Sequence, residues 1–251
     1  SAVDAIFSVI KGLFFKDLKN ILFKSFTWSL KLLITTFWLT LYGLIAVKFL
    51  QAQNPDTSSW EIVYEESFTD VAEGELPEDF FVLDGDFQVI EKEANKCLEL
   101  KGKPVGEHGF LYGPRLSTDS FEVSFSCLGA VKSRRHSVFA GSLGGMRGLT
   151  FRTNPVSKKF LLAYSEAIFG KVSLSNWSSS DWMQVVLHIN RQGDNFQCEI
   201  FVSQKNDSQK AVPMGKVVIQ NQIKSGRCAL WGFAYAEKEM YWDDLKIRVP
   251  Q

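Results

Sequence analysis

The sequence has no excess charge of either sign, because 28 lysine and arginine residues balance 28 aspartate and glutamate residues. This neutrality provides no net field that would attract nucleic acid, so we expect no nucleic-acid partner. Cysteine is scarce, and its four positions lack the close paired spacing of a zinc site. An even number of cysteines in a domain outside the cytoplasm allows one or two disulfides, and small buried thiols are the alternative. The four are Cys97, Cys127, Cys198 and Cys228.

The sequence also lacks a recognisable catalytic constellation. Hydrolysis of a glycosidic bond needs two carboxylates flanking it, and no Glu-x-Asp-x-Glu run supplies them. Asp243 and Asp244 are adjacent, so on a strand their side chains are expected to point to opposite faces. Ser142 in the segment GSLGG lacks the strand–turn–helix setting of a nucleophile elbow. We therefore lean toward a protein without catalytic activity, with a glycan hydrolase as the alternative.

One apolar run, Trp28 to Leu50, is long enough to cross a bilayer. No charge interrupts it between Lys31 and Lys48, which stand about 25 Å apart on a helix that rises 1.5 Å per residue. This length is slightly less than a hydrocarbon core of roughly 30 Å, so both ammonium groups can reach the interfaces. The run predicts a transmembrane helix over residues 27–50.

Within this run, small or hydroxylated residues recur at helical spacing. Such a stripe allows close approach of a second transmembrane helix, which predicts contacts with other subunits. The alternative is that the threonines bond back to carbonyl groups of their own helix. The residues of this stripe are Ser29, Thr36, Thr40 and Gly43.

The charges flanking the run are distributed unequally. Lysines outnumber aspartates before Trp28, whereas no lysine or arginine occurs from Phe49 to Glu91. By the positive-inside rule, the N-terminus is cytoplasmic in a single-pass protein of an inner or organellar membrane. The pattern of residues 1–26 predicts an amphipathic helix that lies on membrane lipid. Residues 51–59 are expected to form a polar linker. Residues 60–251 are then periplasmic, lumenal or extracellular.

Residues 60–251 consist of short alternating segments separated by turn residues. In WMQVVLHINR, for example, Met183, Val185, Leu187 and Ile189 share one face, as expected for a strand with one buried side. About a dozen such segments without a helical period predict an antiparallel sandwich or barrel.

Several of these segments resemble, in order, the concanavalin A-like lectin/glucanase jelly-roll superfamily, in particular its laminin-G-like and 3-keto-disaccharide hydrolase-like domains. The matching segments are EESFTD with GELPEDFFVLDGDFQVIE, then GLTFRTNP, WMQVVLHINRQGDNFQCEIFV and GRCALWGFAYAEKEMYWDDLKI. The resemblance covers Trp60 to Val249 and implies an all-β jelly-roll sandwich behind the membrane anchor. It says little about function, since that fold carries lectins, hydrolases and structural modules alike.

The resemblance also implies where a sugar would bind, on one sheet or along its edge loops. Arg152 is the strongest candidate because it occupies the position of the superfamily's strand arginine in GLTFRT. The alternative is an arginine paired with a carboxylate of a neighbouring strand. The candidate sugar-binding residues are Arg152, His136, Tyr164, Glu166, Trp177 and Trp182.

Calcium is the inorganic ligand that the resemblance allows, held by carboxylates between the first and last strands. Surface carboxylates that bind no metal are the commoner explanation, and otherwise we expect no cofactor. The candidate ligands are Glu66, Asp70, Asp243 and Asp244.

A basic segment, KSRRH at Lys132 to His136, is a further surface feature that could meet lipid headgroups, an acidic partner or a sulfated glycan.

Two functions follow from these observations. The absence of a catalytic constellation and the stripe in the apolar run favour a non-catalytic accessory subunit of a larger membrane protein complex. The alternative is a membrane-tethered module that binds or hydrolyses carbohydrate. It predicts an open groove that contains Arg152 and at least one exposed tryptophan.

Overall fold

The structure is a computed structural model that describes residues 60–102, 106–116, 120–143, 148–164, 167–174, 177–205, 212–219 and 225–251. The predicted helices at 1–26 and 27–50, the stripe from Ser29 to Gly43 and the linker at 51–59 lie outside these residues. Within them, no helix is long and apolar enough to span a membrane. The described residues form an all-β sandwich, as the alternating segments predicted.

The first layer of the described sandwich is an eight-stranded sheet in which every pairing is antiparallel. In sheet order its strands are β15 (Val212–Ile219), β14 (Asn195–Gln204), β13 (Met183–Gln192), β6 (Phe121–Leu128), β17 (Met240–Pro250), β4 (Asn95–Leu100) and β3 (Phe87–Lys92), and β1 (Trp60–Glu66) pairs with β17. The first and last described strands are therefore neighbours, as the resemblance implied.

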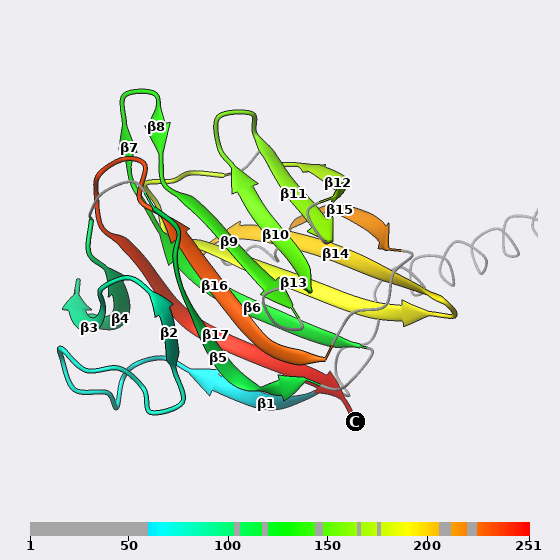
Figure 1. Cartoon of the computed structure of the whole chain (residues 1–251), viewed down its shortest axis with the longest axis horizontal. Helices are drawn as coiled ribbons and strands as arrows, with labels where there is room; N and C mark the ends of the chain where they lie inside the picture. The colour runs from blue at the N-terminus through cyan, green and yellow to red at the C-terminus, as the bar shows by residue number, and fades with distance from the viewer. Residues whose placement is uncertain are drawn as a thin grey trace, which may run out of the picture. The chain divides into compact units, whose positions relative to one another are not determined.

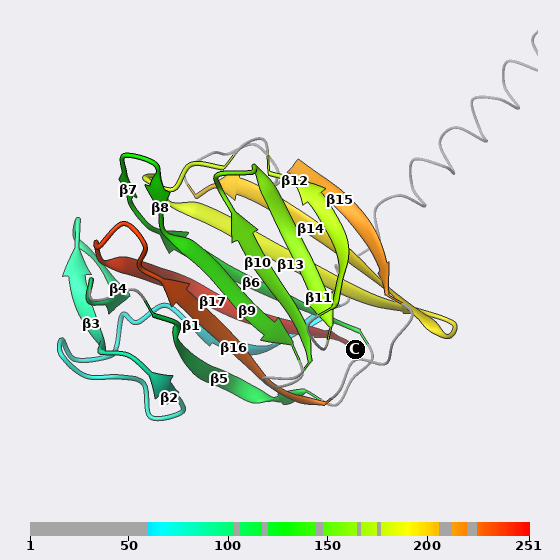
Figure 2. The same ribbon diagram turned by 45° about the horizontal axis from the view of Figure 1, so that its top comes forward.

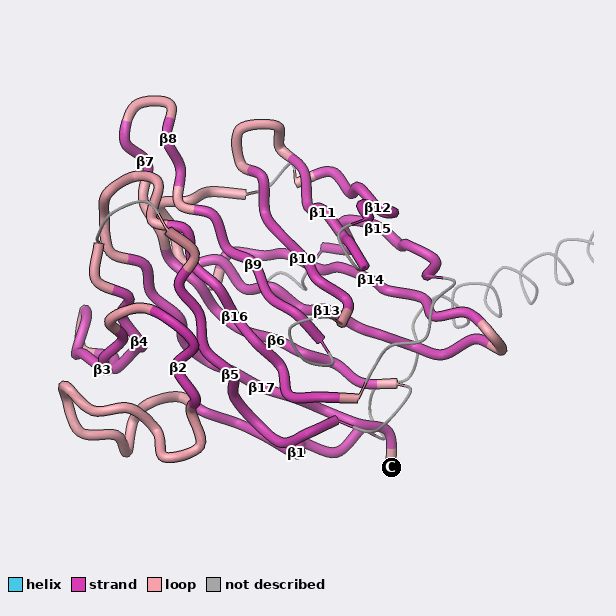
Figure 3. Tube along the Cα trace, viewed as in Figure 1, coloured by secondary structure: helices cyan, strands magenta, loops and turns pink. Residues whose placement is uncertain are grey.

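The second layer is a seven-stranded antiparallel sheet, and Figures 1 and 2 show it stacked on the first. In sheet order its strands are β12 (Ala167–Ser173), β11 (Lys159–Tyr164), β10 (Leu149–Asn154), β9 (Val138–Leu143), β16 (Gly226–Phe233), β5 (His108–Leu116) and β2 (Phe81–Asp84). A short hairpin of β7 (Val131–Lys132) and β8 (Arg135–His136) leads into β9 and projects from one end of the sandwich (Figures 1 and 3).

The core lies between the two sheets because each strand places alternate residues on one face. Met183, Val185, Leu187 and Ile189 of β13 are all fully buried, which confirms the predicted core face of this strand. Aromatic rings join the layers, since Phe125 of β6 stacks on Phe151 of β10 with ring centroids 5.8 Å apart. These contacts hold the seven-stranded sheet in place and leave its other face turned away from the core.

All four cysteines are buried in this core, and none forms a disulfide. Burial raises the pKa of the Cys97, Cys198 and Cys228 thiols to about 12 and that of Cys127 well above its ordinary value. The thiolate, which is the nucleophile, is therefore scarce at neutral pH.

We accordingly expect the four thiols to be inert in the folded protein. Titration with Ellman's reagent at pH 8 should show no rapid reaction of the native chain and four reactive thiols after unfolding in guanidinium. Mass spectrometry of the unreduced chain provides the control, since a disulfide would leave fewer than four thiols to titrate. A rapid reaction of one or more thiols in the native chain would contradict this prediction.

Candidate functional site

The outer face of the seven-stranded sheet carries the strongest candidate for a functional site. In β10, Leu149, Phe151 and Thr153 are buried toward the core, and the alternating Arg152 is only partly buried. Because side chains alternate across a strand, Arg152 points to the face turned away from the core.

The strand register places Arg152 in a row of residues that crosses this face. Arg152 lies opposite Ala140 of β9 on one side and opposite Leu161 of β11 on the other. Ala140 in turn lies opposite Trp231 of β16, and Trp231 lies opposite Gly109 of β5. The row therefore brings an arginine and a partly exposed tryptophan to one surface, with a single small residue between them.

Gly109 is required at its position because the Trp231 indole lies directly over it. A Cβ atom at Gly109 would be 2.1 Å from Trp231 Cδ1 and 2.6 Å from Nε1. Real Cβ contacts are essentially never this short. The glycine thus lets the indole lie close against the backbone of β5.

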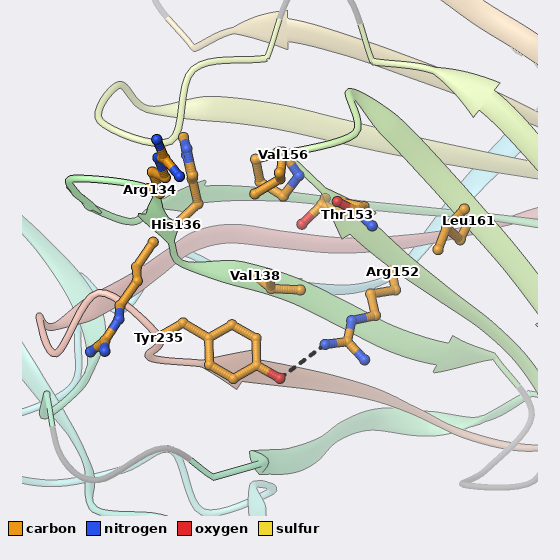
Figure 4. Close-up of a pocket in the computed structure, with 11 residues that line it drawn as sticks. Arg134, His136, Val138, Arg152, Thr153, Val156, Leu161 and Tyr235 are labelled. Atoms are coloured by element: carbon orange, nitrogen blue, oxygen red, sulfur yellow. Dashed lines mark hydrogen bonds between the residues drawn. The ribbon is translucent and has the colours of Figure 1, made fainter.

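Two aromatic side chains hold the Arg152 guanidinium in place. Its Nη2 donates a hydrogen bond of 3.1 Å to Tyr235 Oη, and Cζ lies 4.2 Å from the centroid of the Phe233 ring. Figure 4 shows Arg152 pointing toward Tyr235, with a dashed line marking this hydrogen bond. No carboxylate within the described ranges pairs with Arg152. The alternative that the sequence left open, an arginine paired with a carboxylate of a neighbouring strand, therefore does not describe Arg152. Its positive charge therefore has no carboxylate partner among the described residues.

Two adjoining hollows, of about 510 and 500 Å³, lie over this row and share Arg152 and Leu161. We call them together the Arg152 groove. The first hollow is further lined by Arg134, Arg135, His136, Val138, Thr153, Asn154, Pro155, Val156 and Tyr235. The second is further lined by Glu107, Ala140, Gly141, Thr150, Phe151, Ala163, Trp231 and Phe233.

The floor of the Arg152 groove is apolar. Val138, Ala140 and Phe233 form a small hydrophobic cluster of their own, against which Trp231 and Tyr235 pack. Flat aromatic faces beside a hydrogen-bond donor suit a ligand with an apolar ring face and polar edges. Among the described residues that line the groove, Glu107 is the single carboxylate, whereas glycoside hydrolysis needs two.

The other predicted sugar-binding residues do not all gather at the groove. His136 lines the first hollow, and its Nδ1 lies 3.4 Å from Ser179 Oγ. Trp177 Nε1 donates to the same hydroxyl at 3.1 Å, but the Trp177 ring packs against Phe139 of the core.

Two of the remaining three candidates, Trp182 and Tyr164, lie elsewhere. Trp182 precedes β13 of the eight-stranded sheet, and Lys205 Nζ lies 5.1 Å from its ring centroid. Tyr164 shares the core-facing side of β11 with Phe160 and Leu162. Glu166 lies outside the described residues.

Sequence reasoning missed the aromatic part of the groove. Trp231, Phe233 and Tyr235 were not among the candidates, although they alternate with the buried Cys228 and Leu230 in RCALWGFAY. This alternation indicates an aromatic face on β16 and the residues that follow it. It does not show which strands lie beside that face.

The calcium candidates fall into two separate groups. Glu66 and Asp70 line a shallow acidic hollow with Glu78 and Asp79, and Glu66 Oε1 accepts a hydrogen bond of 2.5 Å from the Phe68 amide. Asp243 and Asp244 lie together on β17, next to Leu245, which is the residue opposite Glu66. Within the described ranges no group of three or more His, Cys, Asp or Glu side chains is arranged to hold a metal ion.

Asp243 and Asp244 share one cation instead. Lys205 Nζ lies 2.5 Å from Asp243 Oδ2 and 2.8 Å from Asp244 Oδ2. The expectation that these carboxylates point to opposite faces was therefore wrong. The register of β17 with β6 shifts between Asp243 and Lys246, and Asp244 has a φ of 50°, so a bulge turns both carboxylates toward Lys205.

Comparison with known proteins identifies the fold of this domain. No family model and no curated protein matches the sequence. The exoplasmic/lumenal domain of VIP36, in a Ca²⁺- and mannose-bound form, aligns over 78% of this chain and 91% of its own with a TM-score of 0.51 and 7% identity. The carbohydrate recognition domain of Emp46p, in a mutant form, aligns over 75% of this chain and 97% of its own with a TM-score of 0.51 and 12% identity. The described domain has the lectin-like jelly-roll fold.

Proposed function

We propose that residues 60–251 form a non-catalytic carbohydrate-binding module whose site is the Arg152 groove. The observation that carries this proposal is the row in which Arg152 and the partly exposed Trp231 flank Ala140. Sugar rings present an apolar face that packs on an indole, and hydroxyl groups at their edges that accept hydrogen bonds from a guanidinium. The Arg152 groove and its partly exposed tryptophan therefore support the carbohydrate-binding alternative.

The fold supports the same proposal. VIP36 was solved with mannose, and the Emp46p domain is described as a carbohydrate recognition domain. Fold alone does not assign function, so the argument depends on the groove. The accessory-subunit interpretation depends on residues 27–50, which lie outside the described part of the chain, and it stays a prediction.

Attachment to a membrane and export of the domain are part of the proposal. They depend on the apolar run and on the charge asymmetry around it. Protease digestion of the domain in sealed vesicles of known orientation would test them, because an exported domain is accessible only from the outer side.

A calcium ligand is a separate question. The VIP36 domain was solved with Ca²⁺ bound, but here Lys205 lies between Asp243 and Asp244. A cation at these two carboxylates would have to displace the lysine ammonium. An unchanged melting temperature after addition of EDTA would argue against any structural calcium.

The Trp231→Ala and Arg152→Gln variants are expected to weaken glycan binding about tenfold each, which corresponds to roughly 1.4 kcal/mol. The first removes the stacking surface and the second the charged donor. A glycan array, followed by titration calorimetry with the best ligand, measures the effect on the full chain in neutral nanodiscs.

Trp182→Ala serves as the matched control, because Trp182 contacts Lys205 and lines neither hollow. It should leave the affinity unchanged. The proposal fails if the full chain binds no glycan, or if both groove variants bind as tightly as the unmodified protein.

A further inference from the structure

The charges around the Arg152 groove define the kind of glycan that it fits. We infer that the ligand is an acidic saccharide, with one ring stacked at Trp231 and a sulfate or carboxylate group of a neighbouring ring at the Arg134 end. This inference rests on the proposed function and adds the chemical class and the orientation of the ligand.

The first hollow has an excess of positive charge. It is lined by Arg134, Arg135 and Arg152, and it has no carboxylate among its lining residues. Arg135 is neutralised by Glu237, with Nη1 2.6 Å from Oε1. Neither Arg134 nor Arg152 forms an ion pair with any carboxylate that the structure describes. A guanidinium group binds sulfate and carboxylate through paired hydrogen bonds, so these two arginines suit an anionic group.

The Arg134 side chain is presented by a hairpin that is fastened to the sandwich. Glu237, in the loop after β16, accepts a hydrogen bond of 2.6 Å from Lys132 as well as that from Arg135. These contacts lie on both sides of the Ser133–Arg134 turn of the β7–β8 hairpin. In Figure 4, Arg134 and His136 lie on one side of Val138 and Arg152 lies on the other. Because the hairpin is held, little ordering is required when an anion binds between them.

The second hollow has the opposite character. Its lining contains Trp231, Phe233, Ala140 and Ala163, and its one carboxylate is Glu107. An anionic ring at this end would face the Glu107 charge, whereas a neutral ring would lie on the indole. The charge difference between the hollows therefore orients the saccharide along the groove.

The shape of the site favours a saccharide over other anions. A membrane surface would meet the protruding cations of the hairpin but would not enter two hollows with an aromatic floor. A nucleic acid would need a continuous basic track, which a chain of balanced charge does not indicate. An oligosaccharide with one neutral and one acidic ring matches both the aromatic floor of the Arg152 groove and the difference in charge between its two hollows.

The test uses the full chain in nanodiscs of neutral lipid and an array in which each sulfated, sialylated or uronate-containing glycan is printed beside its neutral parent. We expect the preferred ligands to be acidic and to bind about tenfold or more tightly than their parents. Arg134→Gln should reduce binding of the acidic glycan about tenfold, to the level at which the neutral parent binds the unmodified protein. Trp231→Ala should weaken both.

The control variant is Arg191→Gln, which makes the same change of charge at the exposed β13–β14 hairpin of the other sheet and should change neither affinity. Vesicles of neutral lipid with and without phosphatidylserine, and duplex DNA, are measured in parallel.

The outcomes separate this inference from the proposed function. Equal binding of neutral and acidic glycans, with no effect of Arg134→Gln, would overturn the inference and leave the carbohydrate module in place. Absence of binding to every glycan would overturn both. Binding to phosphatidylserine vesicles or DNA that is lost in Arg134→Gln but independent of Trp231 would assign the arginines to another anion and also overturn the inference.

Discussion

The Lys205→Met variant is expected to lose roughly 3 kcal/mol of unfolding free energy at pH 7, because it leaves a buried aspartate without its cation. Asp243 is 1% exposed, and Lys205 Nζ is its charged partner at 2.5 Å. Methionine retains most of the volume of lysine and removes the charge. The hydrogen bond of 2.7 Å that Asn95 Nδ2 donates to Asp243 remains, but it cannot neutralise the carboxylate.

The loss of unfolding free energy in the Lys205→Met variant should diminish as the pH falls. Burial raises the pKa of Asp243, and the hydrogen bond and charge of Lys205 oppose this rise. Without the lysine the pKa of Asp243 in the folded state rises further above its unfolded value. In this variant the Asp243 carboxyl group binds its proton more tightly in the folded state than in the unfolded state. The folded state therefore regains stability as the pH falls through the raised pKa of Asp243. Guanidinium unfolding at pH 7 and pH 5 measures the difference.

Two further variants provide the controls. Lys205→Met combined with Asp243→Asn removes both charges and should recover much of the lost stability. Lys246→Met removes a lysine paired at 2.6 Å with the exposed Glu65, and we expect it to cost about 0.5 kcal/mol. If Lys205→Met and Lys246→Met were equally stable, the Lys205 ion pair would have no special role.

The Gly109→Val variant is expected to weaken glycan binding about tenfold or more, at least as much as Trp231→Ala, while retaining the fold. Its Cβ atom would meet Trp231 Cδ1 at 2.1 Å and the Leu230 carbonyl oxygen at 2.8 Å, so the indole must leave the floor of the Arg152 groove. Overpacking of this kind costs about 1–3 kcal/mol of stability. Titration with the best array ligand measures binding, and guanidinium unfolding measures stability.

A second substitution separates the two effects. Trp231→Ala in the Gly109→Val background removes the collision with the indole, so part of the lost stability should return, whereas glycan binding should not. Full glycan affinity in Gly109→Val would show that the position of the indole over Gly109 is not needed for the ligand.

Local patterns were sufficient to predict most of the strands, although β5, β7 and β8 were not among the predicted segments. The alternation of Met183, Val185, Leu187 and Ile189 predicts a strand with one buried face, and the structure places all four in the core. The resemblance implied that the first and last strands pair, and Glu66 lies opposite Leu245 in β1 and β17. Predictions of this kind succeed because side-chain alternation is a property of the local backbone.

Local patterns failed where the chain departs from regular strand geometry. Asp243 and Asp244 were expected on opposite faces, but the bulge in β17 turns both toward Lys205 at the end of β14. A bulge depends on the register of the neighbouring strand, which two adjacent residues do not reveal.

The sequence by itself determined most of the strands of this domain, their antiparallel sandwich or barrel class and the position of Arg152 on a strand. Only the tertiary structure decided that Trp231 rather than Trp177 or Trp182 lies beside Arg152, and that Tyr235 and Phe233 hold its guanidinium. The reason is that β16, β9 and β10 become neighbours through long-range pairing. A row across a sheet therefore combines residues from distant parts of the chain, and its composition follows from register and not from local pattern.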